Sequence, residues 1–133
     1  MRTLFICLFS FFLSTAFAQK APTITWQFDT KEDNLGTPRT DIFLLVNGKK
    51  HFITKGTGEF SELPADNFSD PNYQIPKNAI SACSGFWGGL GNRLCVVPQG
   101  NVLFVQQGFL DSEANDTKIK YQTIKKIPLS PKK

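Results

Sequence analysis

The segment Thr40–Thr54, TDIFLLVNGKKHFIT, decides the fold expected for this chain. Asn47 and Gly48 separate two strand-like runs, and both residues tolerate the positive φ that a type I′ hairpin turn requires. A two-residue turn fixes the register of its strands. We therefore expect these opposed pairs: Val46 with Lys49, Leu44 with His51, Phe43 with Phe52, and Ile42 with Ile53. The first run is apolar on both faces, which predicts a central position in its sheet.

Strand patterns also flank this hairpin. Thr23–Phe28 (TITWQF) alternates apolar and polar residues, which predicts a strand with Ile24, Trp26 and Phe28 on one face. Leu94–Gln107 predicts a second hairpin, whose turn is the sequence PQGN at Pro98–Asn101. Thr117–Ile127 predicts a last strand, in which the apolar phase slips by one residue before Ile124, as at a β-bulge or an edge.

The segments between these strands are less regular. Lys55–Asn72 is rich in turn-forming residues and is expected to be an exposed loop pinned by Phe60 and Phe68. Pro76–Ala82 fits either one helical turn or a strand. About six antiparallel strands in one domain predict an all-β fold, either a small antiparallel barrel or a two-sheet sandwich.

The first eighteen residues have the pattern of a secretory signal peptide. Arg2 precedes the apolar run LFICLFSFFL, and Ala16-Phe17-Ala18 places small residues immediately before Gln19. The run is too short to span a membrane. The sequence therefore predicts a signal peptide over residues 1–18 and a single β domain over residues 19–133. We expect the mature protein to be secreted or periplasmic, with no membrane anchor after cleavage.

Two cysteines remain in the predicted mature chain, Cys83 and Cys95. An even pair in an oxidising compartment predicts one disulfide bond, which would stabilise the fold by roughly 3 kcal/mol. A two-cysteine metal site is the alternative, but His51 is the only histidine available to complete it. We therefore expect no metal site, and no motif indicates a cofactor.

The segment Ser81–Val97, SACSGFWGGLGNRLCVV, is the strongest candidate for a binding site. It holds two aromatic residues among glycines, and it lacks the Lys-Ser/Thr ending of a phosphate-binding loop. An aromatic pair on a glycine loop predicts a recognition surface. The predicted binding residues are Phe86, Trp87, Gly88, Gly89 and Asn92. In the alternative interpretation, Phe86 and Trp87 fold back and cap one end of the barrel.

Other chemically suggestive residues have structural interpretations. His51 shares an apolar strand face, and the sequence places no nucleophile or carboxylate at a spacing typical of catalysis, so no catalytic residue is predicted. Asp111, Glu113 and Asp116 alternate, but they lack the glycine and the closing glutamate of a calcium loop. Asn67 and Asn115 each match the N-glycosylation pattern.

Three short motifs carry a resemblance to a group of proteins. Phe17-Ala18-Gln19, FLLVNGKK at Phe43–Lys50, and IPKNAISAC at Ile75–Cys83 before an aromatic-glycine loop resemble small secreted proteins of Bacteroidetes-type bacteria. That group has no assigned function. The resemblance implies an exported address and nothing about chemistry.

The predicted function is that of a small exported binding or inhibitory module that acts on a protein partner. The alternatives are a carbohydrate-binding module that uses Trp87 and Trp26, or a small secreted hydrolase with its residues spread along the strands. The formal net charge is +4, with cations gathered at the C-terminus. Because no basic stripe alternates with stacking aromatics, we expect no nucleic-acid partner.

Overall fold

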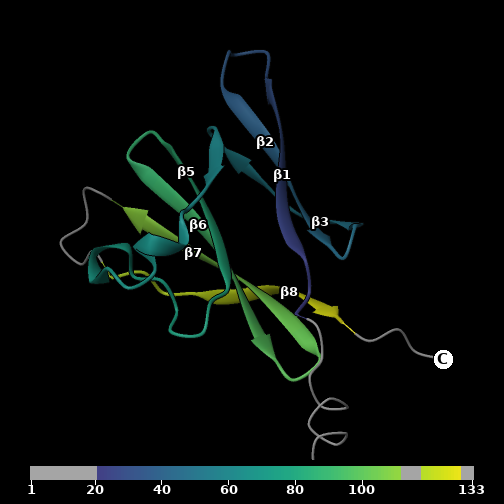
Figure 1. The fold of residues 1–133 in the computed structure, drawn as a ribbon. Helices are drawn as coiled ribbons and strands as arrows, with labels where there is room; N and C mark the ends of the chain where they lie inside the picture. Colours follow the sequence, from purple (N-terminus) through teal and green to yellow (C-terminus); the bar gives the residue numbers. More distant parts are fainter. Residues whose placement is uncertain (1–20, 112–117, 130–133) are drawn as a thin grey trace, which may run out of the picture.

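The computed structural model describes residues 21–111 and 118–129, which form two antiparallel β-sheets packed face to face (Figure 1). The strands are β1 Ile24–Glu32, β2 Pro38–Val46, β3 Lys49–Thr57, β4 Phe60–Glu62, β5 Ser81–Trp87, β6 Leu90–Gln99, β7 Val102–Asp111 and β8 Gln122–Pro128. Two short 3₁₀ helices, η1 Ala65–Asn67 and η2 Pro71–Tyr73, follow β4. The predicted signal peptide and Gln19 lie outside the described residues.

The fold is an all-β sandwich. Of the two folds predicted from the sequence, a two-sheet sandwich and a small barrel, the sandwich is confirmed. One layer has the strand order β1-β2-β3 and the other has the order β4-β5-β6-β7-β8 (Figure 1). Strand pairing between described residues stays within each layer, so the alternative prediction, a closed barrel, is wrong. None of the described helices is long and apolar enough to cross a membrane.

The first sheet follows the predicted hairpin closely. Asn47 has a φ of 51° and Gly48 a φ of 83°, as the two-residue turn requires. The predicted partners of Val46, Leu44 and Phe43 are confirmed, and β2 is the central strand. The fourth predicted pair is wrong, because a β-bulge between Ile42 and Phe43 leaves Ile53 unpaired and places Thr54 opposite Ile42.

The second sheet is a meander of sequence neighbours. The β6–β7 turn is tighter than predicted, because Gln99 pairs with Val102 and only Gly100 and Asn101 lie between them. At β8 the predicted slip is confirmed. Val105 faces Lys125 while Gln106 faces Thr123, so Ile124 is the extra residue of a bulge on an edge strand.

The chain passes from one sheet to the other between β3 and β4. Gly58 lies at this crossover with a φ of 98°; its N–H donates to the Pro38 carbonyl at 2.8 Å, and the Thr40 hydroxyl donates to its carbonyl at 2.5 Å. Phe60 then enters the core. The segment Lys55–Asn72 is therefore not one loop, because it holds the end of β3, all of β4, all of η1 and the first two residues of η2.

The core lies between the two layers. The Trp26 indole N–H donates to the Ser81 hydroxyl at 2.7 Å, which links β1 to β5 across the sandwich. The buried core residues are Trp26, Ile42, Leu44, Val46, Ile53, Phe60, Cys83, Leu94, Val96, Leu103, Val105 and Ile127, with Ile24, Phe28 and Leu129 packed against them. Ile24, Trp26 and Phe28 thus share one face, as predicted.

The predicted disulfide is absent: Cys83 and Cys95 are both free and both buried. Cys83 pairs with Leu94 and belongs to the core between the sheets, whereas Cys95 pairs with Ala82. Directly paired residues share a face of the sheet, and successive residues of one strand point to opposite faces. Cys83 therefore lies on the same face as its partner Leu94, and Cys95, which follows Leu94, lies on the other face. Two side chains on opposite faces of one sheet do not meet the geometry of a disulfide.

Candidate functional site: the open end of the sandwich

The predicted glycine loop is the tip of the β5–β6 hairpin. Gly88 and Gly89 have φ values of 59° and 84°, so they form a two-residue turn, and Trp87 pairs directly with Leu90. Cys83 points into the core, and every second residue of a strand points to the same face. Gly85 and Trp87 therefore lie on the inner face of β5. Phe86 therefore lies on the outer face. The two aromatic residues point to opposite sides of the same strand.

Four large apolar side chains are exposed at this end of the second sheet. They are Phe86 at 61 % exposure, Trp87 at 47 %, Leu90 at 44 % and Phe109 at 50 %, and we refer to them as the apolar cluster. The strand register brings three of them together on the inner face, because Leu90 is the partner of Trp87 and Phe109 is the partner of Asn92, whereas Phe86 lies on the outer face of the same tip. Phe86 and Trp87 are thus half-exposed side chains at a hairpin tip, and neither belongs to the buried core.

A first hollow of about 600 Å³ lies between the ends of the two sheets. We call it the acidic hollow, because its lining includes Glu32 and Glu59 and no cationic residue among those described. Its residues come from the β1–β2 turn region, from β4 and from β5: Glu32, Gly36, Pro38, Glu59, Ser61, Ser84, Gly85, Phe86 and Trp87. Figure 1 shows the β1–β2 and β5–β6 hairpin tips diverging from each other on this side.

A second hollow of about 260 Å³ lies between β3 and the inner face of the second sheet. We call it the amide hollow, because the side-chain amide of Gln107 donates to that of Asn92 at 3.1 Å in its wall. Asn92 itself is 8 % exposed. The other lining residues are Thr54, Lys55, Gly56, Thr57, Trp87, Leu90 and Phe109.

The β3–β4 crossover connects the two hollows. Trp87 lines both hollows. Gly58, at the crossover, lies against the backbone of Phe86, the residue before Trp87. A Cβ atom placed on Gly58 would lie 2.8 Å from the carbonyl oxygen of Phe86, so only glycine lets the crossover approach β5 this closely. The crossover thereby fixes the hairpin tip relative to the first sheet.

The rim of the acidic hollow depends on the β1–β2 turn. Asp33 accepts hydrogen bonds from the backbone N–H groups of Leu35 and Thr37 at 2.9 and 3.0 Å, and from Arg39 Nε at 3.2 Å. These bonds, chiefly the one from Thr37, hold the pKa of Asp33 below its usual value. The carboxylate therefore orders the turn that carries Gly36 to the hollow.

The structure separates the five predicted binding residues by role. Phe86 and Trp87 line the hollows, Gly88 and Gly89 form the turn, and Asn92 is buried in a wall, so it is not a surface contact. Sequence reasoning missed Leu90, Phe109 and the two glutamates of the acidic hollow. Only the β6–β7 register brings Phe109 next to Trp87, and only the packing of the sheets brings Glu32 next to β5.

The two tryptophans have different environments, although both were assigned to the carbohydrate-binding alternative. Trp26 is 7 % exposed, and its indole N–H is bonded inside the core. It therefore presents no surface to a sugar ring. Trp87 is the tryptophan of the open end.

The titratable residues outside the two hollows form no evident site. His51 lines neither hollow, and burial, followed by the charges of Lys49 and Lys125, lowers its pKa. Within residues 21–111 and 118–129, no three His, Cys, Asp or Glu side chains gather to hold a metal ion. Glu113 and Asp116 of the predicted acidic loop, and Asn115, lie outside the described residues. No protein-family model, curated protein or solved structure matched the chain in comparisons with each.

Proposed function

We propose that the protein is a small exported binding module that uses the open end of its sandwich to hold a protein partner. The observation that supports this proposal is the apolar cluster, four large side chains exposed at one end of one sheet. Three of these side chains, Trp87, Leu90 and Phe109, share the inner face of the sheet. Exposed apolar side chains that lie together, unlike single ones, are typical of interaction sites. Aromatic residues also dominate the energetics of protein interfaces.

The backbone of the site favours binding with a small entropic cost. The hairpin tip is a two-residue turn, and β6 is paired on both sides, with β5 and with β7. The crossover at Gly58 packs against Phe86 and limits movement toward the first sheet. A surface that is ordered before it meets its partner loses less conformational freedom on binding.

Affinity capture from the periplasm and the culture medium tests the proposal. The protein is immobilised as the unchanged chain, as Trp87→Ala and as Phe52→Ala. Phe52 is a matched control, because it is 48 % exposed on the outer face of the first sheet, away from the open end. We expect a protein retained by the unchanged chain and by Phe52→Ala but lost from Trp87→Ala. A partner that Trp87→Ala retains equally well would contradict the proposal.

Carbohydrate binding is a second candidate, and the amide hollow is the observation that favours it. Trp87 offers a ring face there, and the half-buried amide of Gln107, held by its hydrogen bond to the buried Asn92, offers a donor and an acceptor for hydroxyl groups. A glycan array probed with the unchanged chain and with Trp87→Ala tests this candidate. If a glycan on the array binds the unchanged chain but not Trp87→Ala, and affinity capture retains no protein, the partner is a glycan and not a protein.

A further inference from the structure

We propose that the acidic hollow receives a Lys or Arg side chain presented by a segment of the partner protein. This inference rests on the proposed function and names the chemistry of the partner. It follows from three independent features of one hollow: its size, its aromatic side chains and its uncompensated negative charge.

The hollow can accommodate part of a polypeptide. Its volume of about 600 Å³ lies within the range of about 300–1,000 Å³ that ligand pockets occupy. It is formed by three separate parts of the chain, the end of the β1–β2 hairpin, β4 and the end of β5. A segment that enters it would contact both sheets at once.

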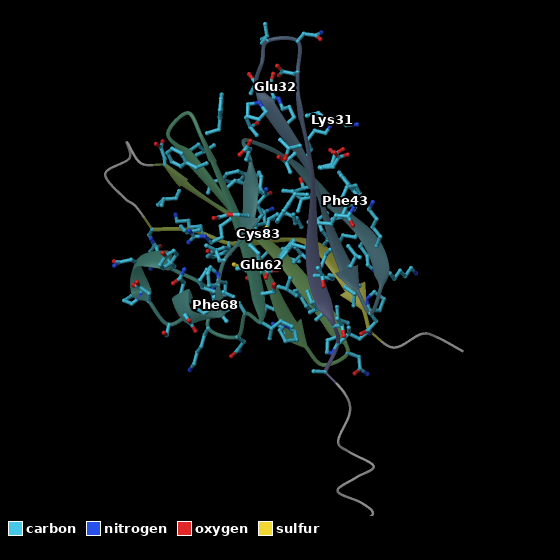
Figure 2. The ribbon with its side chains drawn as sticks, turned by 45° about the horizontal axis from the view of Figure 1, so that its top comes forward. Lys31, Glu32, Phe43, Glu62, Phe68 and Cys83 are labelled. Carbon is cyan, nitrogen blue, oxygen red and sulfur yellow. The ribbon has the colours of Figure 1, made fainter. Side chains whose placement is uncertain are left out.

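Among the residues that the structure describes, no cation pairs with the two glutamates of the hollow. Neither Glu32 nor Glu59 forms an ion pair with any described residue, whereas the neighbouring cations do: Lys31 pairs with Asp29 at 3.9 Å and Arg39 with Asp33 at 3.2 Å. Alternation along β1 directs Glu32 toward the inner side and Lys31 toward the outer side. Figure 2 labels both residues at the end of β1 nearest the turn.

The aromatic part of the lining favours the same occupant. Phe86 and Trp87 line the hollow together with the two glutamates. Aromatic ring faces attract Lys and Arg side chains, and carboxylates pair with their charged ends. The long apolar stem of either side chain would lie along one of these two rings, which point to opposite sides of β5, while its charged end meets a carboxylate. An acidic partner segment would instead meet two like charges.

Selection from a phage-displayed library of random linear peptides tests the inference. The targets are the unchanged chain, the double variant Glu32→Gln/Glu59→Gln, the variant Trp87→Ala and the control Glu62→Gln. Glu62 is exposed on β4 but does not line the hollow, so its substitution makes a charge change without touching the site (Figure 2). Because all three glutamates are exposed, the Gln variants are expected to unfold at the same temperature as the unchanged chain.

We expect the unchanged chain and Glu62→Gln to enrich peptides that contain Lys or Arg. The double Gln variant should lose this enrichment. A synthetic peptide from the selection should bind the double variant about tenfold more weakly, because exposed charge pairs and cation–π contacts are individually modest. Its affinity should also fall as salt is raised from about 0.1 M to about 1 M, which shortens the screening length from about 10 Å to about 3 Å.

The outcomes separate this inference from the proposed function. Peptides that need Trp87 but carry no cation, or that bind the double Gln variant unchanged, would overturn the basic occupant and leave the open end as a binding surface. If no selected peptide depends on Trp87, both the inference and the proposed function are rejected.

Discussion

Cys83 lies opposite Leu94 and Cys95 lies opposite Ala82, so one pair of adjacent strands holds two thiols that face opposite sides of the sheet. The strands are close enough for cross-strand contact, but the alternation of side chains keeps the sulfur atoms apart. Each thiol is fully buried. Burial also raises the pKa of both thiols, that of Cys95 to about 11, which suppresses the reactive thiolate.

Both thiols are therefore expected to be free and unreactive in the folded protein. Ellman's reagent at neutral pH should label neither Cys83 nor Cys95 before unfolding, and both after unfolding in denaturant without a reductant. A chain that shows no thiol even when unfolded would restore the disulfide predicted from the sequence.

Stability should fall at alkaline pH. Cys95 has an ordinary pKa of 9.0 and a folded-state pKa of about 11, raised by burial, so its neutral form stabilises the folded chain. That contribution is fully present below pH 9.0 and is lost as pH rises toward 11. A shift of this size corresponds to about 2–3 kcal/mol. Urea midpoints measured across this range should fall, and Cys95→Ala should flatten part of the fall; an unchanged slope in that variant would exclude Cys95 as the cause.

The two glycines Gly48 and Gly56 should respond differently to alanine. A Cβ atom on Gly56 would lie 2.5 Å from the Phe60 ring. A Cβ atom on Gly48 would meet no other atom within 4 Å, but the backbone there has a φ of 83°, which is strained for any residue with a side chain. We expect Gly56→Ala to cost about 2–3 kcal/mol through overpacking, and Gly48→Ala about 1–2 kcal/mol through backbone strain. The sequence predicted an exposed loop from Lys55 onward, in which a side chain at Gly56 would have room, but Gly56 lies in β3.

A double-variant cycle measured by urea unfolding distinguishes the two mechanisms. Phe60→Leu removes part of the ring that blocks a side chain at Gly56. The cost of Gly56→Ala should therefore shrink in the Phe60→Leu background, while the cost of Gly48→Ala stays the same. Additive costs at both positions would mean that the Phe60 ring is not what excludes a side chain at Gly56.

The exposure of Trp87 can be measured by fluorescence. In Trp26→Phe, the remaining Trp87 should emit near the position of free indole and be quenched by iodide, because it is 47 % exposed. In Trp87→Phe, the buried Trp26 should emit at shorter wavelength and resist iodide. Trp26→Ala should destabilise the fold by about 3–5 kcal/mol, and Trp87→Ala by less than about 1 kcal/mol. If Trp87 emits at short wavelength and iodide does not quench it, Trp87 is buried and the apolar cluster is not an exposed surface.

Acid should loosen the β1–β2 turn before the β2–β3 turn. The pKa of Asp33 lies below its ordinary value of 3.8, so its contribution is present above 3.8 and is lost as pH falls through the lower folded-state value. The amide protons of Leu35 and Thr37, which bond to Asp33, should then exchange faster, while the ladder around Asn47 and Gly48 keeps its protection. In Asp33→Asn these amides should show no such acid step; the same step in that variant would point to another group.

The features that sequence predicted are those set by neighbouring residues. The turn at Asn47 and Gly48 fixed the β2–β3 register as far as Phe43, where an unforeseen bulge displaced Ile53. The alternation in TITWQF correctly put Trp26 inside the sandwich. The bulge at Ile124 was visible as a slip in apolar phase. Each of these depends on residues a few positions apart.

The features that sequence did not predict depend on pairing or packing between distant residues. The thiols failed to pair because of the phase between β5 and β6, which a count of cysteines does not contain. Phe60 lies after the crossover and fills the core against Gly56 and Gly85, so a stretch with loop-like composition contributes a core residue. The candidate site was located at Phe86 and Trp87, but its acidic lining comes from Glu32 at the end of β1 and from Glu59 just before β4.

Within residues 21–111 and 118–129, every strand pairs with strands that are consecutive to it in the chain, and the chain passes from the first sheet to the second once, at Gly58. Such a topology closes only short segments of chain at each step, which lowers the entropic barrier to folding. The first three strands complete their meander before any residue of the second sheet is needed. Each meander is thus a separate unit of assembly, and Phe60, the second residue after Gly58, enters the core and couples the formation of one unit to that of the other.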